Sequence, residues 1–80
     1  MISLNYDNQY DILYIGFADK SNSDGEEFKN GFVLLTDADS NEITGLTIFD
    51  FMKKYENGVL KTTNLPFDID YDADILPFIK

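Results

Sequence analysis

The first residues that could do chemistry are two aspartates and two tyrosines near the N-terminus. Asp7 and Asp11 lie four positions apart, between Tyr6 and Tyr14. Paired carboxylates can act as general acid and general base, with a tyrosine hydroxyl assisting. Such a site needs a deep cleft to shift a carboxyl pKa, and a chain of 80 residues has little room for one. We therefore favour an exposed turn in which Asp11 accepts hydrogen bonds from backbone amides and Tyr14 is half-buried.

A second candidate is the spacing of Asp37, Asp39 and Asn41, which matches the start of a calcium-binding loop. A complete loop has glycine at its sixth position and an acidic residue at its twelfth. Here those positions hold Glu42 and Ile48. The segment is better interpreted as a hairpin turn in which aspartate side chains bind nearby backbone amides.

Four aspartates near the C-terminus form the most distinctive pattern. Asp68, Asp70, Asp72 and Asp74 alternate with apolar residues, so in a strand they would form one row with a spacing of about 6.6 Å. One interpretation is a partner-binding edge that imitates nucleic-acid phosphates, although a straight row would match only every second phosphate. The other is that like charges keep an edge strand from pairing with a second chain. The pattern alone favours the second interpretation, and both remain open.

The residue types that are missing exclude several kinds of chemistry. The chain has lysines but no arginine, histidine or cysteine. Without cysteine there is no thiol nucleophile, disulfide or zinc–thiolate site, and without histidine there is no imidazole base or ligand. Without arginine there is no bidentate phosphate clamp. We therefore expect no cofactor and no metal site.

Charge gives the clearest indication of function. Six lysines and fifteen acids give a net charge of −9, and residues 1–50, with two lysines and ten acids, carry −8 of it. This charge repels nucleic acids and anionic membranes and attracts basic proteins, so we expect a basic protein partner. The candidate partner-binding residues are the acids of the tail and of the segment 19–30: Asp68, Asp70, Asp72, Asp74, Asp24, Glu26 and Glu27.

Short apolar segments separated by Asp- and Asn-rich turns predict two antiparallel hairpins. The first pairs residues 2–6 with 12–17, and the second pairs 32–36 with 43–49. The run 12–17 is apolar on both faces, which is typical of an interior strand. The expected fold class is therefore mainly β, a β-rich α+β fold with two hairpins in a small twisted sheet of undetermined strand order.

The other segments complete a single small domain over residues 1–80. Residues 19–30 are predicted to form an acidic polar loop, with a short extended piece possible at 26–29. One short helix is predicted at about 51–57, with Asp50 as its N-cap.

The C-terminal extension 59–80 begins with a connector or short strand. It continues into an acidic edge strand, because the prolines that bracket it, Pro66 and Pro77, and its charged residues both suit a sheet edge. The alternative is a helix with one apolar stripe, formed by Ile69, Ala73 and Leu76.

The hairpins also carry a recognisable pattern: Tyr-Asp followed by Asp-x-Leu-Tyr-Ile, then a glycine-led strand, an Asp-rich turn and a second glycine-containing strand. The residues that carry it are Tyr6, Asp7, Asp11, Leu13, Tyr14, Ile15, Gly31, Phe32, Val33, Asp37, Asp39, Ile43, Gly45, Leu46, Ile48 and Asp50. Over about residues 2–50 the chain resembles a small bacterial and phage family, the domain of unknown function number twenty-two eighty-three. Thr47 stands where that family has a glutamate. The resemblance implies a compact β-rich fold and no particular activity, and some relatives look like partners of neighbouring toxin genes.

These observations predict a non-catalytic acidic interaction protein that binds and neutralises or regulates a basic protein, of the antitoxin, immunity or phage-inhibitor type. One alternative is a homo-oligomeric structural domain, such as a homodimer that pairs through an edge or an aromatic face. A less favoured alternative is a small enzyme that uses only carboxylates, tyrosine and lysine. No signal-peptide pattern and no apolar run near the ~20 residues of a membrane helix is found, so we expect a cytoplasmic location without membrane binding.

Overall fold

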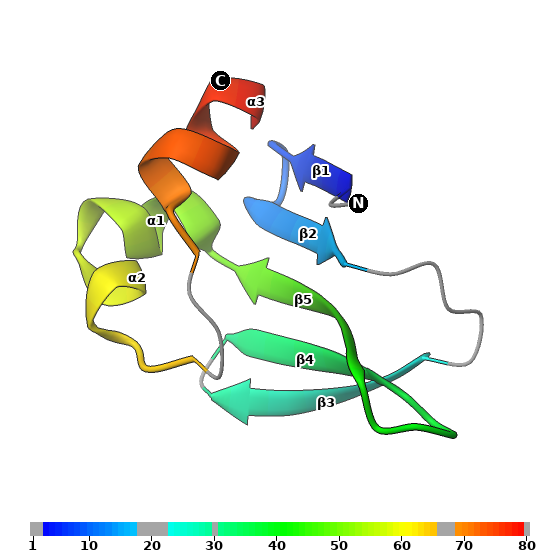
Figure 1. Cartoon of the computed structure of the whole chain (residues 1–80). Coiled ribbons are helices and arrows are strands. Elements are labelled where there is room, and N and C mark those ends of the chain that lie inside the picture. Colours follow the sequence, from blue (N-terminus) through cyan, green and yellow to red (C-terminus); the bar gives the residue numbers. More distant parts are fainter. Residues whose placement is uncertain (1–2, 18–22, 30, 66–68, 80) are drawn as a thin grey trace.

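The structure is a computed structural model that describes residues 3–17, 23–29, 31–65 and 69–79. Its first part is one antiparallel sheet with the spatial order β1-β2-β5-β4-β3 (Figure 1). The strands are β1 (Ser3–Asp7), β2 (Ile12–Gly16), β3 (Ser23–Lys29), β4 (Phe32–Asp37) and β5 (Ile43–Phe49). The fold is therefore mainly β, as predicted.

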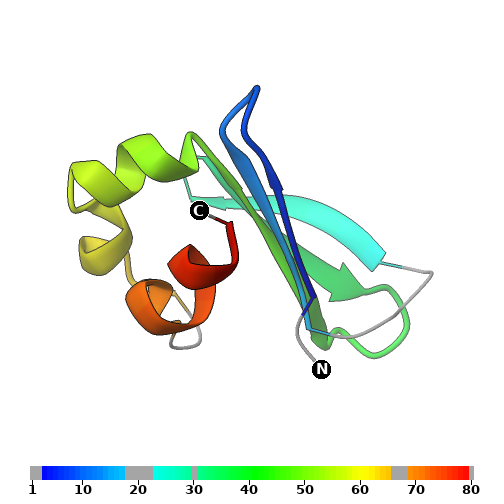
Figure 2. The same cartoon turned by 90° about the horizontal axis from the view of Figure 1, so that it is seen from above.

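Short helical segments follow the sheet along the chain. They are α1 (Phe51–Glu56), α2 (Val59–Thr62), the π-helical turn η1 (Tyr71–Ile75) and α3 (Leu76–Ile79). Figure 2 shows that these segments all lie on one side of the sheet, where they form a second layer. We call this second layer the helical layer. The opposite side of the sheet carries no helix of the described residues.

The core lies between the sheet and the helical layer. Alternate side chains of each strand point toward the helices, where they pack against apolar side chains on the sides of the helices that face the sheet. The ring of Phe51 is fully buried and packs against Tyr6 and Tyr71, with ring centroids 6.1 Å and 6.0 Å away. The buried apolar residues are Leu13, Ile15, Phe32, Leu46, Ile48, Phe51, Leu60, Tyr71, Ile75 and Leu76. Each such side chain contributes about 1.5–3 kcal/mol by its burial.

Both predicted hairpins are confirmed. β1 pairs with β2 in a register that puts Tyr6 opposite Leu13, and β4 pairs with β5 in a register that puts Phe32 opposite Ile48. β2 lies between β1 and β5, so its prediction as an interior strand is also confirmed. The edges of the sheet are β1 and β3.

The prediction of a polar loop over 19–30 is wrong for residues 23–29, which form β3 and pair with β4. The extended piece at 26–29 is part of this longer strand. The sequence pattern of this segment is typical of a loop, because the strand has no buried side. β3 is an edge strand, and its described side chains, those of residues 24–28, are all exposed. Exposed edge strands tolerate charged residues on both faces, so they lack the apolar alternation that marks an inner strand.

The prediction of a C-terminal acidic edge strand is also wrong, because residues 71–79 form η1 and α3. Tyr71 and Ile75 are four positions apart and both buried. Residues four positions apart share one face of a strand, whose side chains alternate with a period of two, and also one face of a helix. The spacing of these two residues therefore fits both structures. The helical alternative is correct in kind, although Ala73 is exposed and does not belong to the buried stripe.

The predicted helix at 51–57 is confirmed as α1, and Asp50 holds the N-cap position. Its side chain makes no capping hydrogen bond, because Asp50 adopts a left-handed conformation with φ 53°. The connector that follows is helical as well: Gly58, at φ 75°, turns the chain from α1 into α2.

Candidate interaction surface

Asp11 accepts hydrogen bonds on both of its carboxylate oxygens, and it caps α1 from a distant turn. Its Oδ1 accepts hydrogen bonds from the Met52 amide at 2.8 Å and from the Tyr6 hydroxyl at 2.7 Å. Its Oδ2 accepts from the Lys53 amide at 3.3 Å, and its own carbonyl accepts from the Phe51 amide at 2.9 Å. This confirms that Asp11 binds backbone amides, and it identifies them as the free amides of a helix N-terminus.

The electrostatics of this cluster hold Asp11 ionised and Tyr6 neutral. Partial burial acts to raise the pKa of Asp11, but hydrogen bonds from Tyr6, Met52 and Lys53, together with the charge of Lys54, outweigh burial and lower it. Burial, and then the hydrogen bond and charge of Asp11, raise the pKa of Tyr6 to about 12. Neither group is poised to exchange a proton near neutral pH.

The other members of the predicted acid–base group lie elsewhere. Asp7 Oδ1 accepts from the backbone amides of Gln9 at 3.0 Å and Tyr10 at 3.2 Å, which is the predicted Asp-led turn. Tyr14 follows the buried Leu13 along β2, so its side chain points to the opposite face of the sheet from Tyr6 and is 43% exposed. The structure thus brings Tyr6 and Asp11 together and leaves Tyr14 apart.

The turn between β4 and β5 is the predicted aspartate-stabilised turn. Asp37 Oδ1 accepts from the Asp39 amide at 2.9 Å, and the Asp37 carbonyl accepts from the Asn41 amide at 2.8 Å. Asn41 has φ 62°, a conformation that asparagine tolerates. Within the described ranges, no group of three or more acidic side chains is arranged to hold a metal ion.

Asp70, Asp72 and Asp74, the C-terminal aspartates that the structure describes, do not form a row. Asp68 lies outside the described residues. Asp70 caps η1 by accepting from the Ala73 amide at 3.1 Å, and Asp74 is exposed. Side chains two positions apart on a helical turn point in different directions, so the even spacing expected of a strand is lost.

Asp72 joins three segments of the helical layer. It accepts a hydrogen bond from the Tyr55 hydroxyl of α1 and lies 3.6 Å from the Lys61 ammonium of α2. The hydrogen bond from Tyr55 lowers the pKa of Asp72, burial acts to raise it, and the charge and hydrogen bond of Lys61 lower it further. Asp70 and Asp72 therefore have partners within the chain, although both side chains remain exposed.

A hollow of about 510 Å³ lies between α2 and η1, with Lys61, Asp70, Tyr71 and Asp72 among the residues that line it. The lysine and the two aspartates are engaged as described above. The hydroxyl of Tyr71 is buried and has no hydrogen-bond partner among the described residues. Burial raises the pKa of Tyr71 to about 12, so this hydroxyl stays neutral.

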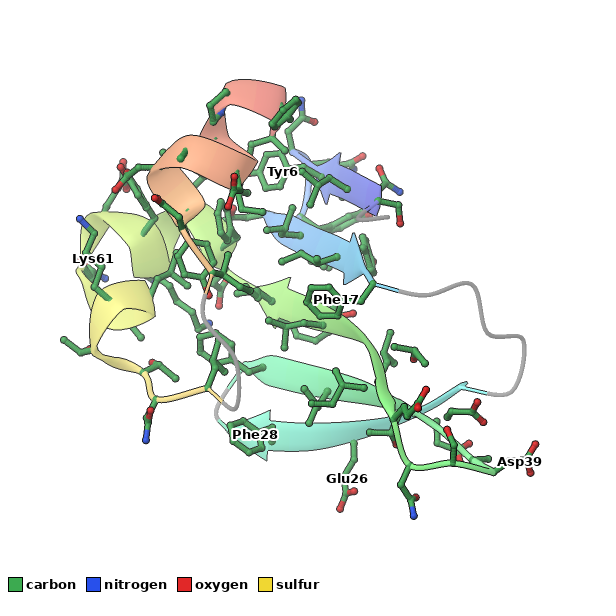
Figure 3. All side chains as sticks on the ribbon, in the orientation of Figure 1. Tyr6, Phe17, Glu26, Phe28, Asp39 and Lys61 are labelled. Carbon is green, nitrogen blue, oxygen red and sulfur yellow. The ribbon has the colours of Figure 1, made fainter. Side chains whose placement is uncertain are left out.

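The acids of the edge strand β3 differ from the C-terminal aspartates in having few partners among the described residues. Asp24, Glu26 and Glu27 are all exposed, and Glu26 points outward from the strand (Figure 3). Within the part of the chain that the structure describes, Asp24 and Glu26 have no side-chain hydrogen bond or ion pair, and Glu27 accepts only from the Gly31 amide at 3.4 Å. Among the described residues, these carboxylates therefore have no partner other than the Gly31 amide at Glu27.

A hollow of about 290 Å³ lies beside these acids. Phe28, Leu34 and Thr36 line it together with Glu26 and Glu27. Its apolar and acidic walls match a lysine or arginine side chain, whose alkyl stem packs on apolar surface while its charge meets a carboxylate. The sequence identified the acids, but it did not indicate that Phe28 and Leu34 lie beside them. We call this site the β3 hollow.

The lysines whose side chains the structure describes are Lys53, Lys54 and Lys61, and all lie on α1 or α2. Lys54 also donates to the Phe49 carbonyl and lies over the Phe32 ring, 5.6 Å from its centroid. The helical layer thus holds the described positive charge. The sheet holds acids on its edge strand β3 and in the tip of the β4–β5 hairpin, where Figure 3 places Asp39.

A single five-stranded antiparallel sheet with helices on one face defines a small α+β domain. The chain belongs to a family described as proteins of unknown function, DUF2283, whose model matches residues 3–51. This confirms the resemblance noted in the hairpins. The matched residues contain all five strands and the first residue of α1, while the rest of the helical layer lies beyond them. No curated protein and no solved structure matches the chain.

Proposed function

We propose that this protein is a non-catalytic interaction domain that binds a basic protein partner at the β3 hollow. The observation that carries the proposal is the hollow itself, where Glu26 and Glu27 adjoin Phe28 and Leu34 at an exposed sheet edge. A lysine or arginine of the partner would place its alkyl stem on Phe28 and Leu34 and its charge beside Glu26 and Glu27. Asp24 adds negative charge on the same strand.

Net charge supports the same function. At −9 on a chain of 80 residues, the protein attracts a basic partner over long range and speeds its association. The partner is a basic protein, such as a toxin, a nuclease or another nucleic-acid-binding enzyme, which this chain would block as an antitoxin, immunity protein or phage inhibitor. No helix of the described ranges is long and apolar enough to span a membrane. We place the function in the cytoplasm, where such partners act.

The test is capture of partners on immobilised protein from a lysate of the organism that encodes it, with bound proteins identified by mass spectrometry. The wild type is compared with Glu26→Gln/Glu27→Gln, which removes two charges at the β3 hollow. The matched control is Asp39→Asn/Glu42→Gln, which removes two charges from the exposed β4–β5 turn. We expect a basic protein that the wild type and the control retain and the β3 variant loses.

Retention should weaken steeply as salt rises from about 0.05 to 0.5 M, because the attraction is between exposed charges. Recovery of no basic protein at low salt would contradict the proposal. Equal loss from both charge variants would also contradict it, because net charge rather than the β3 hollow would then govern binding.

A further inference from the structure

The face of the sheet turned away from the helical layer, which we call the open face, has an apolar centre. Its side chains come from the three inner strands, β2, β5 and β4, and cross-strand register places them side by side. Tyr14 and Phe49 are 43% and 41% exposed. The centre of the open face is formed by Ile12, Tyr14, Val33, Leu35 and Phe49, which surround the buried Thr47. In Figure 2 none of the described helices lies on this side of the sheet.

The sequence contained a signal for this surface. Residues 12–17 are apolar on both faces, and only one face of β2 can meet the helical layer. The apolar residues on the other face are therefore left at the surface. Contiguous exposed apolar patches of a few hundred Å² on small proteins are commonly binding sites.

Among the side chains that the structure describes, the charges around the open face have one sign. Glu27 lies beside Val33 across the β3–β4 pair, and Asp7 lies beside Ile12 across the β1–β2 pair, so both stand on this face. The lysines with described side chains are on α1 and α2, on the other side of the sheet. The open face is thus an apolar strip with acids at both ends.

We propose that the open face binds an amphipathic α-helix of the partner, with an apolar side flanked by lysine or arginine. The inference rests on the proposed function, because it assigns a second contact to the same basic protein. The apolar side of the helix would cover Tyr14, Phe49 and Val33, and its basic flanks would meet Glu27 and Asp7. This is the mode in which an amphipathic helix lays its apolar side on a complementary surface.

The size of the patch suits one helix. Three strands at a spacing of about 4.8 Å, and residues spaced about 6.6 Å along each strand, give a patch of roughly 10 by 13 Å between Cα atoms. A helix is about 10 Å wide, and 12 residues extend for about 18 Å.

The same dimensions argue against a second copy of this chain. Tyr14 and Phe49 each leave roughly 80–90 Å² accessible, since a full aromatic side chain presents about 200 Å². The whole patch then offers roughly 300 Å², whereas a stable interface buries about 800 Å² per partner, so the open face alone is too small for a dimer; the basic partner proposed here adds the area of its contact at the β3 hollow. In a dimer through this face, Glu27 and Asp7 of one copy would also face the same acids of the other copy, and like charges that face each other are unfavourable.

The experiment uses three synthetic 18-residue peptides and the full chain labelled with ¹⁵N. The first peptide is an amphipathic helix with leucines on one side and lysines flanking them. The second has glutamate in place of every lysine, and the third has the composition of the first in a scrambled, non-amphipathic order. Affinity is measured by calorimetry, and the binding site is mapped by amide chemical shifts.

We expect the lysine-flanked helix to bind at least 10-fold more tightly than either other peptide. Amide shifts should concentrate on Tyr14, Val33 and Phe49. The substitutions Tyr14→Thr/Phe49→Thr should weaken binding at least 10-fold. The matched variant Tyr10→Thr/Phe78→Thr removes the same two side chains from exposed positions elsewhere, 64% and 73% exposed, and should change affinity less than 2-fold.

Shift mapping on the wild type keeps the test valid if the Tyr14→Thr/Phe49→Thr variant does not fold. If both lysine peptides bind equally and shift Glu26, Leu34 and Thr36 of the β3 hollow but neither Tyr14 nor Phe49, the open face is not the site, while the proposed function stands. If the glutamate peptide binds the open face as tightly as the lysine peptide, the requirement for a basic partner is wrong. A dimer in sedimentation that Tyr14→Thr/Phe49→Thr abolishes would identify a second copy as the occupant and overturn the inference.

Discussion

The carboxylate of Asp11 accepts a hydrogen bond from the Met52 amide at 2.8 Å, although the two residues are 41 positions apart. Asp11 lies in the turn of the first hairpin with φ 56°, and Met52 lies in the first turn of α1. The N-terminus of α1 is therefore capped from the sheet, while Asp50 at the N-cap position contributes no side-chain bond. This contact ties the helical layer to the β1–β2 hairpin.

Replacement of Asp11 by asparagine should lower the free energy of unfolding by about 1–2 kcal/mol. Asparagine tolerates the positive φ of this position, so the change removes the charge and one acceptor oxygen without altering the backbone. The measurement is the midpoint of urea unfolding at neutral pH. Asp50→Asn is the matched control and should change the free energy by less than about 0.5 kcal/mol. An equal loss in the two variants would show that Asp11 does not act as the cap.

Acid should destabilise the protein partly through the same carboxylate. The pKa of Asp11 in the folded protein is below its ordinary value of 3.8, so the folded state binds fewer protons than the unfolded state. Its contribution is complete above about pH 5 and is lost as pH falls through the folded pKa. The stability difference between wild type and Asp11→Asn should therefore shrink between about pH 5 and pH 2 in urea titrations. A difference that stays constant over this range would exclude this linkage.

Removal of the Tyr71 hydroxyl and removal of the Tyr6 hydroxyl should have different effects on the free energy of unfolding. Tyr71→Phe deletes a buried hydroxyl without a described partner and should leave the free energy of unfolding unchanged or raise it by up to about 1 kcal/mol. Tyr6→Phe deletes the donor to Asp11 and should lower it by about 1 kcal/mol. Both are read from urea unfolding curves. A similar loss in both variants would mean that the Tyr71 hydroxyl has a partner.

Salt should stabilise the chain because its acids crowd on the sheet. We expect the Tm to rise by a few degrees between about 0.02 and 0.3 M NaCl, as the Debye length falls below the spacing of these charges. Differential scanning calorimetry measures this change. The variant Asp39→Asn/Glu42→Gln carries two fewer negative charges and should gain less. A Tm that stays flat or falls would show that repulsion among the acids does not limit stability.

The acidic tail shows that an even spacing of charges in the sequence does not guarantee an even row in the structure. The aspartates at 70, 72 and 74 have even spacing in the sequence, but their side chains cap η1, bond Tyr55 and Lys61, or face solvent. The acids of β3 have no such regularity, yet Asp24 and Glu26 lack side-chain partners within the described residues. Availability for a partner depends on what lies next to each carboxylate, and spacing does not report that.

The sequence by itself determined the two hairpins, the interior place of β2 and the helix that follows Asp50. These features depend on local alternation and on turns in which aspartate binds nearby amides, and both are encoded within a few residues. The tertiary structure decided the rest. It selected the helix over the strand for the tail. Tyr71 and Ile75 fit the period of either structure, and the choice depends on their burial in the core, where Tyr71 packs against the distant Phe51. It also made 23–29 an edge strand, recruited Asp11 to cap α1, and left one face of the sheet open, because each depends on contacts between residues far apart in the chain.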